Sequence, residues 1–233
     1  MLLSDTGPDP KPLATCLSEL GIRRIDLLVL SHFDLDHVGG TAAVIGMVDT
    51  VFTGPPGTAS DQALLDSLAA GGATVRIVAD GWSGTLGAAH WHILGPVAPV
   101  PGAPPDPDAG GNDECVIVDW RDRGFSALFL GDLGEDAQRA LLERGELRPV
   151  DVVKMAHHGS ADQDADLYTA VHATIGLISV GVDNGYGHPT PTALHILAAA
   201  GTRAFRTDRQ GMLLVRPSAT GVAVWTERDG GSG

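Results

Sequence analysis

Apolar and polar positions follow one another along the chain in blocks that predict strands and helices in turn. Apolar runs of strand length, rich in β-branched side chains, lie at 25–30, 74–78, 115–120, 125–130, 150–155 and 174–180. Stretches with helical periodicity lie between them, at 12–20, 61–70, 135–145 and 191–201. Gly145 and Gly201 stand where the last two helices should stop. Short strands at 203–205, 211–216 and 222–225 close the chain.

Several of these strands are nearly continuous apolar runs, which predicts a sheet buried on both faces and covered by helices. The fold class is therefore α/β or a mixed αββα arrangement. The segment 95–111 is rich in proline and glycine and lies between two strands, so it predicts a long surface loop rather than a domain boundary. We expect a single domain over 1–228 and a disordered tail over 229–233.

Composition limits the class of protein. Hydrophobic residues make up 43% of the 233 residues, and no apolar run approaches the roughly 20 residues that span a bilayer, which predicts a soluble globular chain. The formal net charge is -14, from 15 Lys and Arg against 29 Asp and Glu. This balance argues against tight non-specific binding to DNA, although bound divalent cations would reverse the sign locally.

The stretch 31-SHFDLDHVGG-40 places two histidines and two aspartates directly after an apolar run. An extended backbone would put His32, Asp34 and Asp36 on one face. A turn after Asp36 would bring His37 in from the side, and the two glycines would let a helix begin close behind. Four nitrogen and oxygen donors that converge at a strand end suit one or two divalent cations. A charged surface turn is the alternative, and this ordered set argues against it.

The same residues resemble the metal-binding signature of the metallo-β-lactamase fold, His-x-Asp-x-Asp-His before Gly-Gly, with Asp34 in place of the usual His. Further stations follow in the family's order. Asp5 in 5-DTG-7 resembles the family's first Asp, which orients the metal loop from behind the ligands. The segment 128-LFLGD-132 resembles the strand before the metal-bridging Asp, and 154-KMAHHGS-160 and 185-GYGHP-189 resemble the later histidine stations. The resemblance implies a four-layer αββα sandwich.

Together with 206-RTDRQG-211, these motifs are most similar to the C-terminal domain of the ComEC family of DNA-internalisation proteins of bacterial competence. The resemblance covers Leu2 to Trp225. The chain differs from the ComEC family at its first strand, and it differs from many superfamily members at Asn112. ComEC domains begin with a strand carrying a DVGQGDA-type segment, so the first N-terminal strand is expected to be missing here. Many superfamily members also place a ligand His before the bridging Asp, where this chain has Asn112, so the His157–His158 pair is the natural donor.

The resemblance implies two divalent metal ions, each bound by three side chains, with one carboxylate bridging both. One ion would take His32, Asp34 and His158; the other would take Asp36, His37 and His188; Asp132 would bridge. Asp36, Asp132 and His157 are the predicted catalytic residues, with His157 orienting a ligand or substrate. The order of His157 and His158 as ligands stays open.

The predicted donor set favours an anionic substrate, because two divalent cations carry more charge than three carboxylates. A bridging water would lose its proton near neutral pH and attack a phosphodiester. Aspartate at position 34 makes one site richer in oxygen, which favours Mn²⁺, with Zn²⁺ able to occupy the site. Asn184, Tyr186 and Ser160 are predicted to contact the substrate. Arg206 and Arg209 either meet a DNA backbone or belong to a solvated turn.

The resulting hypothesis is a metal-dependent nuclease domain of ComEC type that degrades one strand of transforming DNA during uptake. Its partners would be DNA in single-stranded form and the rest of a membrane channel protein, on the extracytoplasmic face of the membrane. No nucleotide cofactor is expected, because the chain has no phosphate-binding GxxxxGK[ST] loop. Two alternatives stay open. One is a stand-alone, cytoplasmic hydrolase of a small phosphodiester or ester, and the other is a non-catalytic DNA-guiding module.

Overall fold

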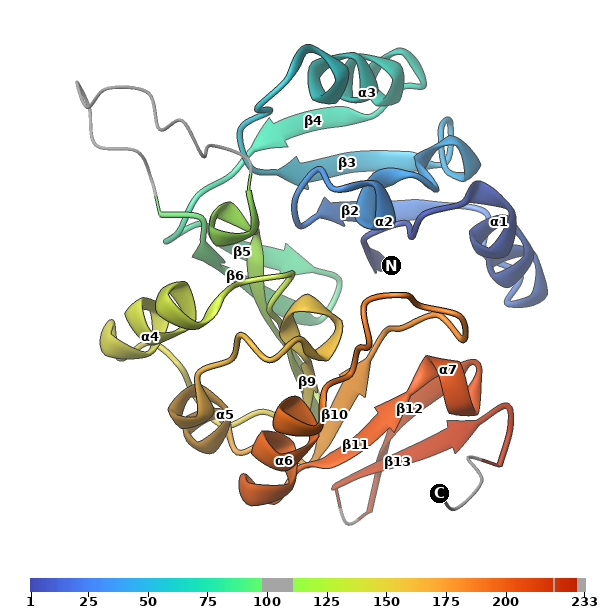
Figure 1. Ribbon diagram of the computed structural model, residues 1–233. Coiled ribbons are helices and arrows are strands. Elements are labelled where there is room, and N and C mark those ends of the chain that lie inside the picture. Colours follow the sequence, from blue (N-terminus) through green and yellow to red (C-terminus); the bar gives the residue numbers. More distant parts are fainter. Residues whose placement is uncertain (98–110, 220, 230–233) are drawn as a thin grey trace. The chain divides into compact units, whose positions relative to one another are not determined.

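The computed structural model describes residues 1–97, 111–219 and 221–229 (Figure 1). The chain forms two compact units. Unit 1 comprises Met1–Leu86 and His92–Ile117, and unit 2 comprises Gly87–Trp91 and Val118–Gly233. Most of the predicted loop at 95–111 and all but the first residue of the predicted tail lie outside the described residues. The single-domain organisation stays a prediction.

Unit 1 contains a sheet of four parallel strands in sequence order (Figure 1). The strands are β1 (Leu2–Ser4), β2 (Ile25–Leu30), β3 (Val48–Thr53) and β4 (Thr74–Ile77). Their connections contain α1 (Pro10–Glu19), α2 (Leu35–Val38), the 3₁₀ turn η1 (Thr41–Ala43) and α3 (Ala59–Ala70). Asp9 caps α1 by accepting from the Lys11 N–H, and Thr58 with Asp61 forms a capping box for α3. A second 3₁₀ turn, η2 (Asn112–Glu114), lies later in the unit.

The core of unit 1 lies where α1 and α3 meet the sheet. Leu28 and Leu30 of β2 and Leu65 and Leu68 of α3 are at most 3% exposed and belong to one apolar cluster. Leu27, whose side chain alternates with these along β2, is also buried, at 4% exposed. The prediction that the run 25–30 is a strand buried on both faces is therefore confirmed.

Unit 2 is built on strands that are mostly parallel, in the spatial order β11-β10-β9-β8-β7. These are β7 (Ile117–Asp122), β8 (Phe125–Phe129), β9 (Val152–Lys154), β10 (Ile175–Ile178) and β11 (Arg203–Arg206). β7 pairs antiparallel with β8, and β8 through β11 pair in parallel. β5 (Ser83–Leu86) and β6 (Ala89–Gly95) lie where the chain passes between the two units.

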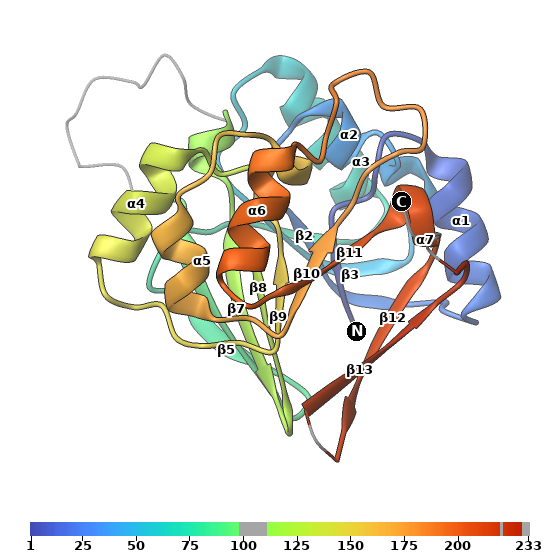
Figure 2. The same cartoon turned by 60° about the horizontal axis from the view of Figure 1, so that its bottom comes forward.

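Both faces of the unit 2 sheet are covered. The helices α4 (Glu135–Glu143), α5 (Ala165–Val171) and α6 (Pro191–Ala199) connect the parallel strands and lie along one face (Figure 2). The hairpin of β12 (Leu213–Ser218) and β13 (Gly221–Thr226) packs on the other face, against Ala127, Val152 and Ile175. The short helix α7 (Thr207–Gln210) follows β11.

The sequence pattern located most of these elements and missed several, among them β1 and the short helices α2 and α7. β3 reads 48-VDTVFT-53, in which aspartate and threonine interrupt the apolar run, and α5 has only seven residues. β5 and β6 were not assigned as strands. Gly145 and Gly201 follow α4 and α6 with φ of 71° and 75°, as the stop signals predicted. Within the described ranges, no helix combines the length and apolar character that crossing a bilayer requires.

Candidate metal centre

The first group of polar side chains lies at the carboxyl end of the unit 1 sheet. β1 and β2 run parallel with Ser4 opposite Val29, so the residues that follow each strand emerge at the same edge. Asp5 follows β1, and its N–H donates to the Val29 carbonyl at 2.8 Å. Ser31 and His32 follow β2. Two segments that are far apart in sequence therefore meet here.

Asp5 holds the start of the histidine loop in place. One carboxylate oxygen, Oδ1, accepts from the Ser31 N–H at 2.7 Å. The other, Oδ2, accepts from the Ser31 hydroxyl at 3.0 Å and lies 3.0 Å from Nδ1 of His37. The Asp5 backbone adopts φ 57°, a left-handed conformation that aspartate tolerates better than most residues.

These contacts fix the tautomer of both histidines. A carboxylate only accepts hydrogen bonds, so Nδ1 of His37 carries the proton that faces Asp5. The Ser31 hydroxyl gives its proton to Asp5 and can therefore accept from Nδ1 of His32, 3.1 Å away. This assignment puts a proton on Nδ1 of each ring and leaves Nε2 as the outward nitrogen, the arrangement of a metal-ligating histidine whose other nitrogen is held by the protein.

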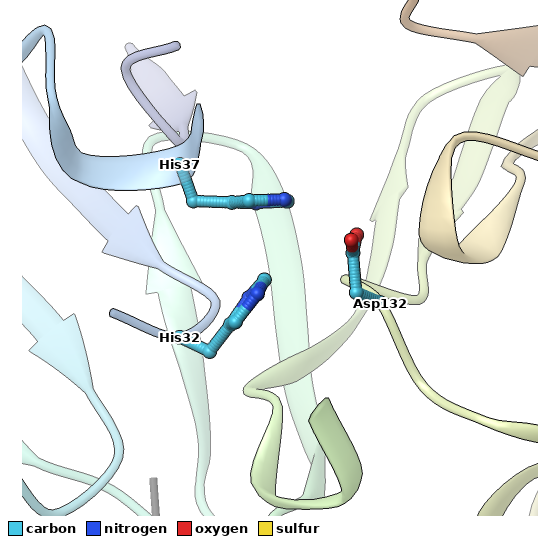
Figure 3. Close-up of side chains that lie close together, drawn as sticks. All are labelled: His32, His37 and Asp132. Atoms are coloured by element: carbon cyan, nitrogen blue, oxygen red, sulfur yellow. The ribbon is translucent and has the colours of Figure 1, made fainter. Parts of the chain in front are cut away.

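The two Nε2 atoms face the two aspartates of the motif. Nε2 of His32 lies 3.6 Å from Oδ2 of Asp34, and Nε2 of His37 lies 4.0 Å from Oδ2 of Asp36. The rings are buried, at 2% and 1% exposed, and their centroids are 4.1 Å apart (Figure 3). The aspartate side chains are 65% and 51% exposed. Each histidine thus has one carboxylate partner on its open side.

The backbone of this motif corrects one sequence prediction. The chain is not extended from His32 to Asp36, because α2 begins at Leu35 with Asp34 as its N-cap residue. Asp36 therefore lies in the first helical turn, not on a continued strand face. The turn comes early because strand pairing ends at Leu30, and the helical bonds to the Asp34 carbonyl form at once, from the N–H groups of His37 and Val38.

The glycine pair after the motif permits a close approach of two backbones. A Cβ on Gly39 would lie 2.4 Å from the Pro8 carbonyl oxygen, and one on Gly40 would lie 2.2 Å from that of Thr6. The Thr6 N–H and hydroxyl donate to the His37 carbonyl at 2.7 and 2.9 Å. The glycines therefore let the segment after Asp5 pass against the end of α2.

The second group of polar side chains lies at the carboxyl ends of the parallel strands of unit 2. Asp132 follows β8 and is 3% exposed (Figure 3). Its Oδ1 lies 3.5 Å from the Lys154 Nζ, and its Oδ2 lies 3.3 Å from Nε2 of His158. Nδ1 of His158 lies 2.6 Å from the Ser179 carbonyl oxygen, which only accepts. His158 therefore also carries its proton on Nδ1 and presents Nε2 to a carboxylate.

The turn that carries the histidine pair is strained. His157 and His158 adopt φ of 47° and 51°, a conformation that costs a non-glycine residue about 1–2 kcal/mol. The turn is held by bonds from the His157 N–H to the Gly131 carbonyl (3.2 Å) and from the Ser160 N–H to the His157 carbonyl (2.8 Å). Strain of this kind concentrates at functional sites.

His157 and His188 lie close to each other beside this turn. Their ring centroids are 5.7 Å apart with the planes near perpendicular. Nδ1 of His157 is buried and has no hydrogen-bond partner among the described residues. The pKa of His188 lies below its usual value, chiefly because of burial and then because a protonated His157 or His158 would repel a further positive charge. A lowered pKa keeps the imidazole of His188 neutral and able to donate its lone pair.

Gly159 is the glycine of this turn that has no room for a side chain. It has φ 81°, and a Cβ would lie 2.6 Å from Cβ of Pro189. Gly145 has φ 71° with nothing within 4 Å, so Gly145→Ala measures the backbone strain alone. We expect Gly145→Ala to lower the free energy of unfolding by about 1 kcal/mol and Gly159→Ala by about 2–4 kcal/mol. Urea unfolding checks this, and equal losses in the two variants would contradict the packing shown here.

The structure places the predicted substrate-contacting residues in different environments. The side-chain amide of Asn184 is used within its own turn, donating to the Gly181 and His188 carbonyls and accepting from the His188 N–H at 3.0–3.1 Å. Tyr186 is 86% exposed, and its ring is stacked on His188 at 6.0 Å between centroids. Ser160 is 6% exposed, and its hydroxyl accepts from Gln163 Nε2 at 3.2 Å. Asn184 and Ser160 thus hold the loops, and Tyr186 is presented outward.

The two arginines of 206-RTDRQG-211 also differ. Arg206 forms a two-pronged ion pair with Asp208, with nitrogen–oxygen distances of 3.0 and 2.6 Å. Burial raises the pKa of Asp208, but the hydrogen bonds and charge of Arg206 outweigh it, and the net pKa is lowered. Arg209 is exposed. The guanidinium of Arg206 is therefore paired with Asp208, whereas that of Arg209 is open to solvent.

The sequence reasoning missed Ser31, Ser179 and the pairing of Lys154 with Asp132. Ser31 had a signal, because a hydroxyl directly before a candidate ligand histidine is well placed to hold its ring. Lys154 had a weaker one, as the cation that ends a strand just before the histidine pair. Ser179 acts through its carbonyl oxygen, for which no side-chain signal exists.

Comparisons with known proteins identify homologues among competence proteins. No protein-family model matches the chain. The chain is 26% identical over 214 residues to ComE operon protein 3 of Bacillus subtilis, covering 88% of the chain and 26% of that protein. It is 27% identical over 220 residues to competence protein ComA of Neisseria gonorrhoeae, covering 91% of the chain and 28% of that protein. The chain thus spans about a quarter of the length of these relatives. The resemblance to the ComEC family found in the sequence is confirmed.

Comparison with solved structures identifies the fold. The metallo-β-lactamase fold protein YhfI of Bacillus subtilis matches with a TM-score of 0.57 at 12% identity, covering 97% of this chain and 86% of that one. CmlA, a diiron β-hydroxylase from Streptomyces venezuelae, matches with a TM-score of 0.54 at 17% identity, covering 79% of this chain and 44% of that one. The chain has the metallo-β-lactamase fold, as predicted. At these identities the likeness establishes the fold and not the reaction.

Proposed function

We propose that this chain is a metal-dependent phosphodiesterase domain that cleaves DNA, as part of a ComEC-type DNA-uptake protein. The observation that carries the proposal is the geometry of His158. Its Nδ1 is held by the Ser179 carbonyl, and its Nε2 lies 3.3 Å from Oδ2 of the buried Asp132. A lone pair and a carboxylate oxygen repel each other unless a proton or a cation lies with them. A divalent metal ion satisfies both at once.

The donor chemistry of each unit fits divalent metal ions. In unit 1 the pairs are His32 with Asp34 and His37 with Asp36, each an imidazole nitrogen beside a carboxylate oxygen. This pairing supports the assignment in which each pair serves a different ion. Following the family resemblance, we propose His158 as the further ligand of the first ion, His188 as that of the second, and Asp132 as the bridge.

Two divalent cations bound to such donors would polarise a phosphoryl oxygen and lower the pKa of a water molecule. The chain's own residues would orient the metal ligands and balance the charge of the bridging carboxylate. Asp5 and Ser31 fix the ring nitrogens of the unit 1 histidines. Lys154 places its ammonium 3.5 Å from Oδ1 of Asp132, as a positive charge beside the carboxylate, and it is fixed there by donating to the Gly131 carbonyl at 3.0 Å. His157, with its buried Nδ1, would orient a ligand or the substrate.

Three observations support DNA over a small ester as the substrate. The relatives are named ComE operon protein 3 and competence protein ComA. Tyr186 exposes 86% of its surface next to His188, as an aromatic face on which a nucleobase can stack. Arg209 is exposed on α7, the short helix after β11, and can meet a phosphate. We place the domain on the extracytoplasmic face of the membrane, joined to a channel that the other parts of a full-length protein would supply.

The proposal is tested with metal-stripped protein refilled with Mn²⁺ or Zn²⁺. We expect cleavage of single-stranded DNA with either ion and a higher rate with Mn²⁺, because Asp34 adds an oxygen donor where the fold's usual motif has a nitrogen. The measurement is the release of fragments from an end-labelled oligonucleotide, run beside hydrolysis of a bis-aryl phosphodiester. Protein kept in chelator is the control.

The outcomes separate the candidates. Hydrolysis of the bis-aryl phosphodiester without any cleavage of DNA would indicate a small-molecule phosphodiesterase. Metal binding without cleavage of either substrate would indicate a non-catalytic module. A higher rate with Zn²⁺ than with Mn²⁺ would refute the metal assignment and leave the nuclease assignment standing.

A further inference from the structure

Three buried polar side chains of unit 2 form one hydrogen-bonded network beside the histidine turn. Gln138, Gln163 and Tyr168 are 0%, 5% and 0% exposed. Gln138 lies on α4 and Tyr168 on α5, two helices that lie side by side (Figures 1 and 2). Gln163 directly precedes Asp164, the N-cap of α5. The network therefore joins both helices to the loops at the carboxyl ends of β8 and β9.

The polar atoms of both amides are used. Nε2 of Gln138 donates to the Leu133 carbonyl at 2.6 Å and to Oε1 of Gln163 at 3.1 Å, and its Oε1 accepts from the Asp164 N–H at 3.0 Å. Oε1 of Gln163 also accepts from the Tyr168 hydroxyl at 2.5 Å. Burial raises the pKa of Tyr168, so the hydroxyl keeps its proton and remains a donor. These partners allow only one orientation of each amide.

Gln163 brackets the histidine pair. Its Nε2 donates to the Ala156 carbonyl at 3.1 Å and to the Ser160 hydroxyl at 3.2 Å. One amide group thus binds the residue before the pair and the first residue after the turn's glycine. The Tyr168 hydroxyl holds the same flank by accepting from the Ala156 N–H at 3.3 Å. Between these anchors the two histidines take their left-handed conformation.

We propose that Gln163 and Tyr168 are positioning residues that hold the turn at 156–160 so that Nε2 of His158 faces Asp132. The inference deepens the proposed function and rests on it for the catalytic consequence. Buried polar networks of this kind contribute less to stability than apolar packing of equal volume, but they select one geometry. This network contacts the turn on both sides of the two strained histidines, so it can hold the turn in one backbone geometry.

The test uses Gln163→Met, which keeps the length of the side chain and removes its polar atoms, and Tyr168→Phe, which removes one oxygen. We expect amide hydrogen exchange at 156–160 to accelerate at least about 10-fold in metal-free protein, with exchange in α6 unchanged. With Mn²⁺ we expect kcat for the bis-aryl phosphodiester to fall about 10–100-fold and KM to stay within about twofold. Tyr168→Phe is the milder change and keeps the test open if Gln163→Met does not fold.

Val171→Ala is the control for a merely structural effect. Val171 is fully buried on α5 and has no part in the network, so its truncation should lower the urea midpoint and leave kcat and local exchange at 156–160 unchanged. Unchanged exchange at 156–160 in both network variants would overturn the inference, as would an equal fall in kcat for Val171→Ala. If the wild type cleaves no phosphodiester, the proposed function fails, and accelerated exchange in metal-free protein would still support the positioning role.

Discussion

Replacing Asp132 by Asn is expected to lower kcat/KM for phosphodiester cleavage by more than about 100-fold, beyond what loss of an outer partner of a metal site costs. The carboxylate is 3% exposed and faces Nε2 of His158 on one side and the Lys154 ammonium on the other. Asparagine offers one oxygen and no charge. An amide that donates to Nε2 of His158 would also occupy the lone pair that a metal ion needs.

The same substitution should leave the fold intact. The amide can donate to His158, and Lys154 keeps its bond to the Gly131 carbonyl. The readout that does not depend on activity is thermal unfolding with and without Mn²⁺. Ligand at 100 times its Kd stabilises a folded protein by about 2.7 kcal/mol, so the wild type should gain several degrees and Asp132→Asn should gain little.

Asp136→Asn is the matched control, because that carboxylate is 95% exposed on α4 and lies only four residues away. It should behave as the wild type in both assays. If Asp132→Asn retains both metal-dependent stabilisation and cleavage, Asp132 does not bind metal and the proposed centre is wrong. If it loses cleavage but keeps the stabilisation, Asp132 acts on the substrate rather than on the metal ions.

The sequence predicted which strand ends carry the polar side chains of the proposed metal centre, because these side chains follow apolar runs. Asp5 follows β1, Asp132 follows β8, and the histidine pair follows β9. Within each parallel sheet the residues after the strands emerge at one edge, so order along the chain places Asp5 beside the histidine loop in unit 1 and Asp132 beside the histidine pair in unit 2. The side chains themselves were chosen by their resemblance to a known signature, since a run of histidines and aspartates has few other physical explanations.

The sequence could not reveal how these side chains are held. Ser179 contributes a carbonyl oxygen, and any residue type supplies one. Gln163 and Tyr168 lie in a stretch whose polar residues read as surface, yet both are buried, because partners from α4 and the histidine turn satisfy their polar atoms. Partners of this kind depend on tertiary packing between segments and leave no periodic pattern.

Replacing Asp5 by Asn is expected to weaken Mn²⁺ binding and lower kcat/KM by at least about 10–100-fold, although it substitutes none of the proposed ligands. Asn keeps an oxygen for the Ser31 N–H, and it tolerates the left-handed backbone at this position as well as aspartate does. Its NH₂ group, however, then faces Nδ1 of His37 at the place where a carboxylate oxygen stood 3.0 Å away. Because two donors cannot face each other, His37 must move its proton to Nε2, which removes the lone pair that would bind metal.

The change of tautomer can be observed directly in metal-free protein. Nitrogen-15 chemical shifts of the His37 ring should show a protonated Nδ1 in the wild type and a protonated Nε2 in Asp5→Asn. Asp9→Asn is the control, because Asp9 is an exposed cap of α1 and makes no contact with a histidine. A wild-type tautomer in Asp5→Asn together with normal activity would show that Asp5 does not set the state of His37. A shifted tautomer with undiminished Mn²⁺ binding would exclude His37 as a ligand. We expect Asp5→Asn to lose both the wild-type tautomer of His37 and tight Mn²⁺ binding. This result would show that the Asp5 carboxylate enables the histidine loop to bind metal.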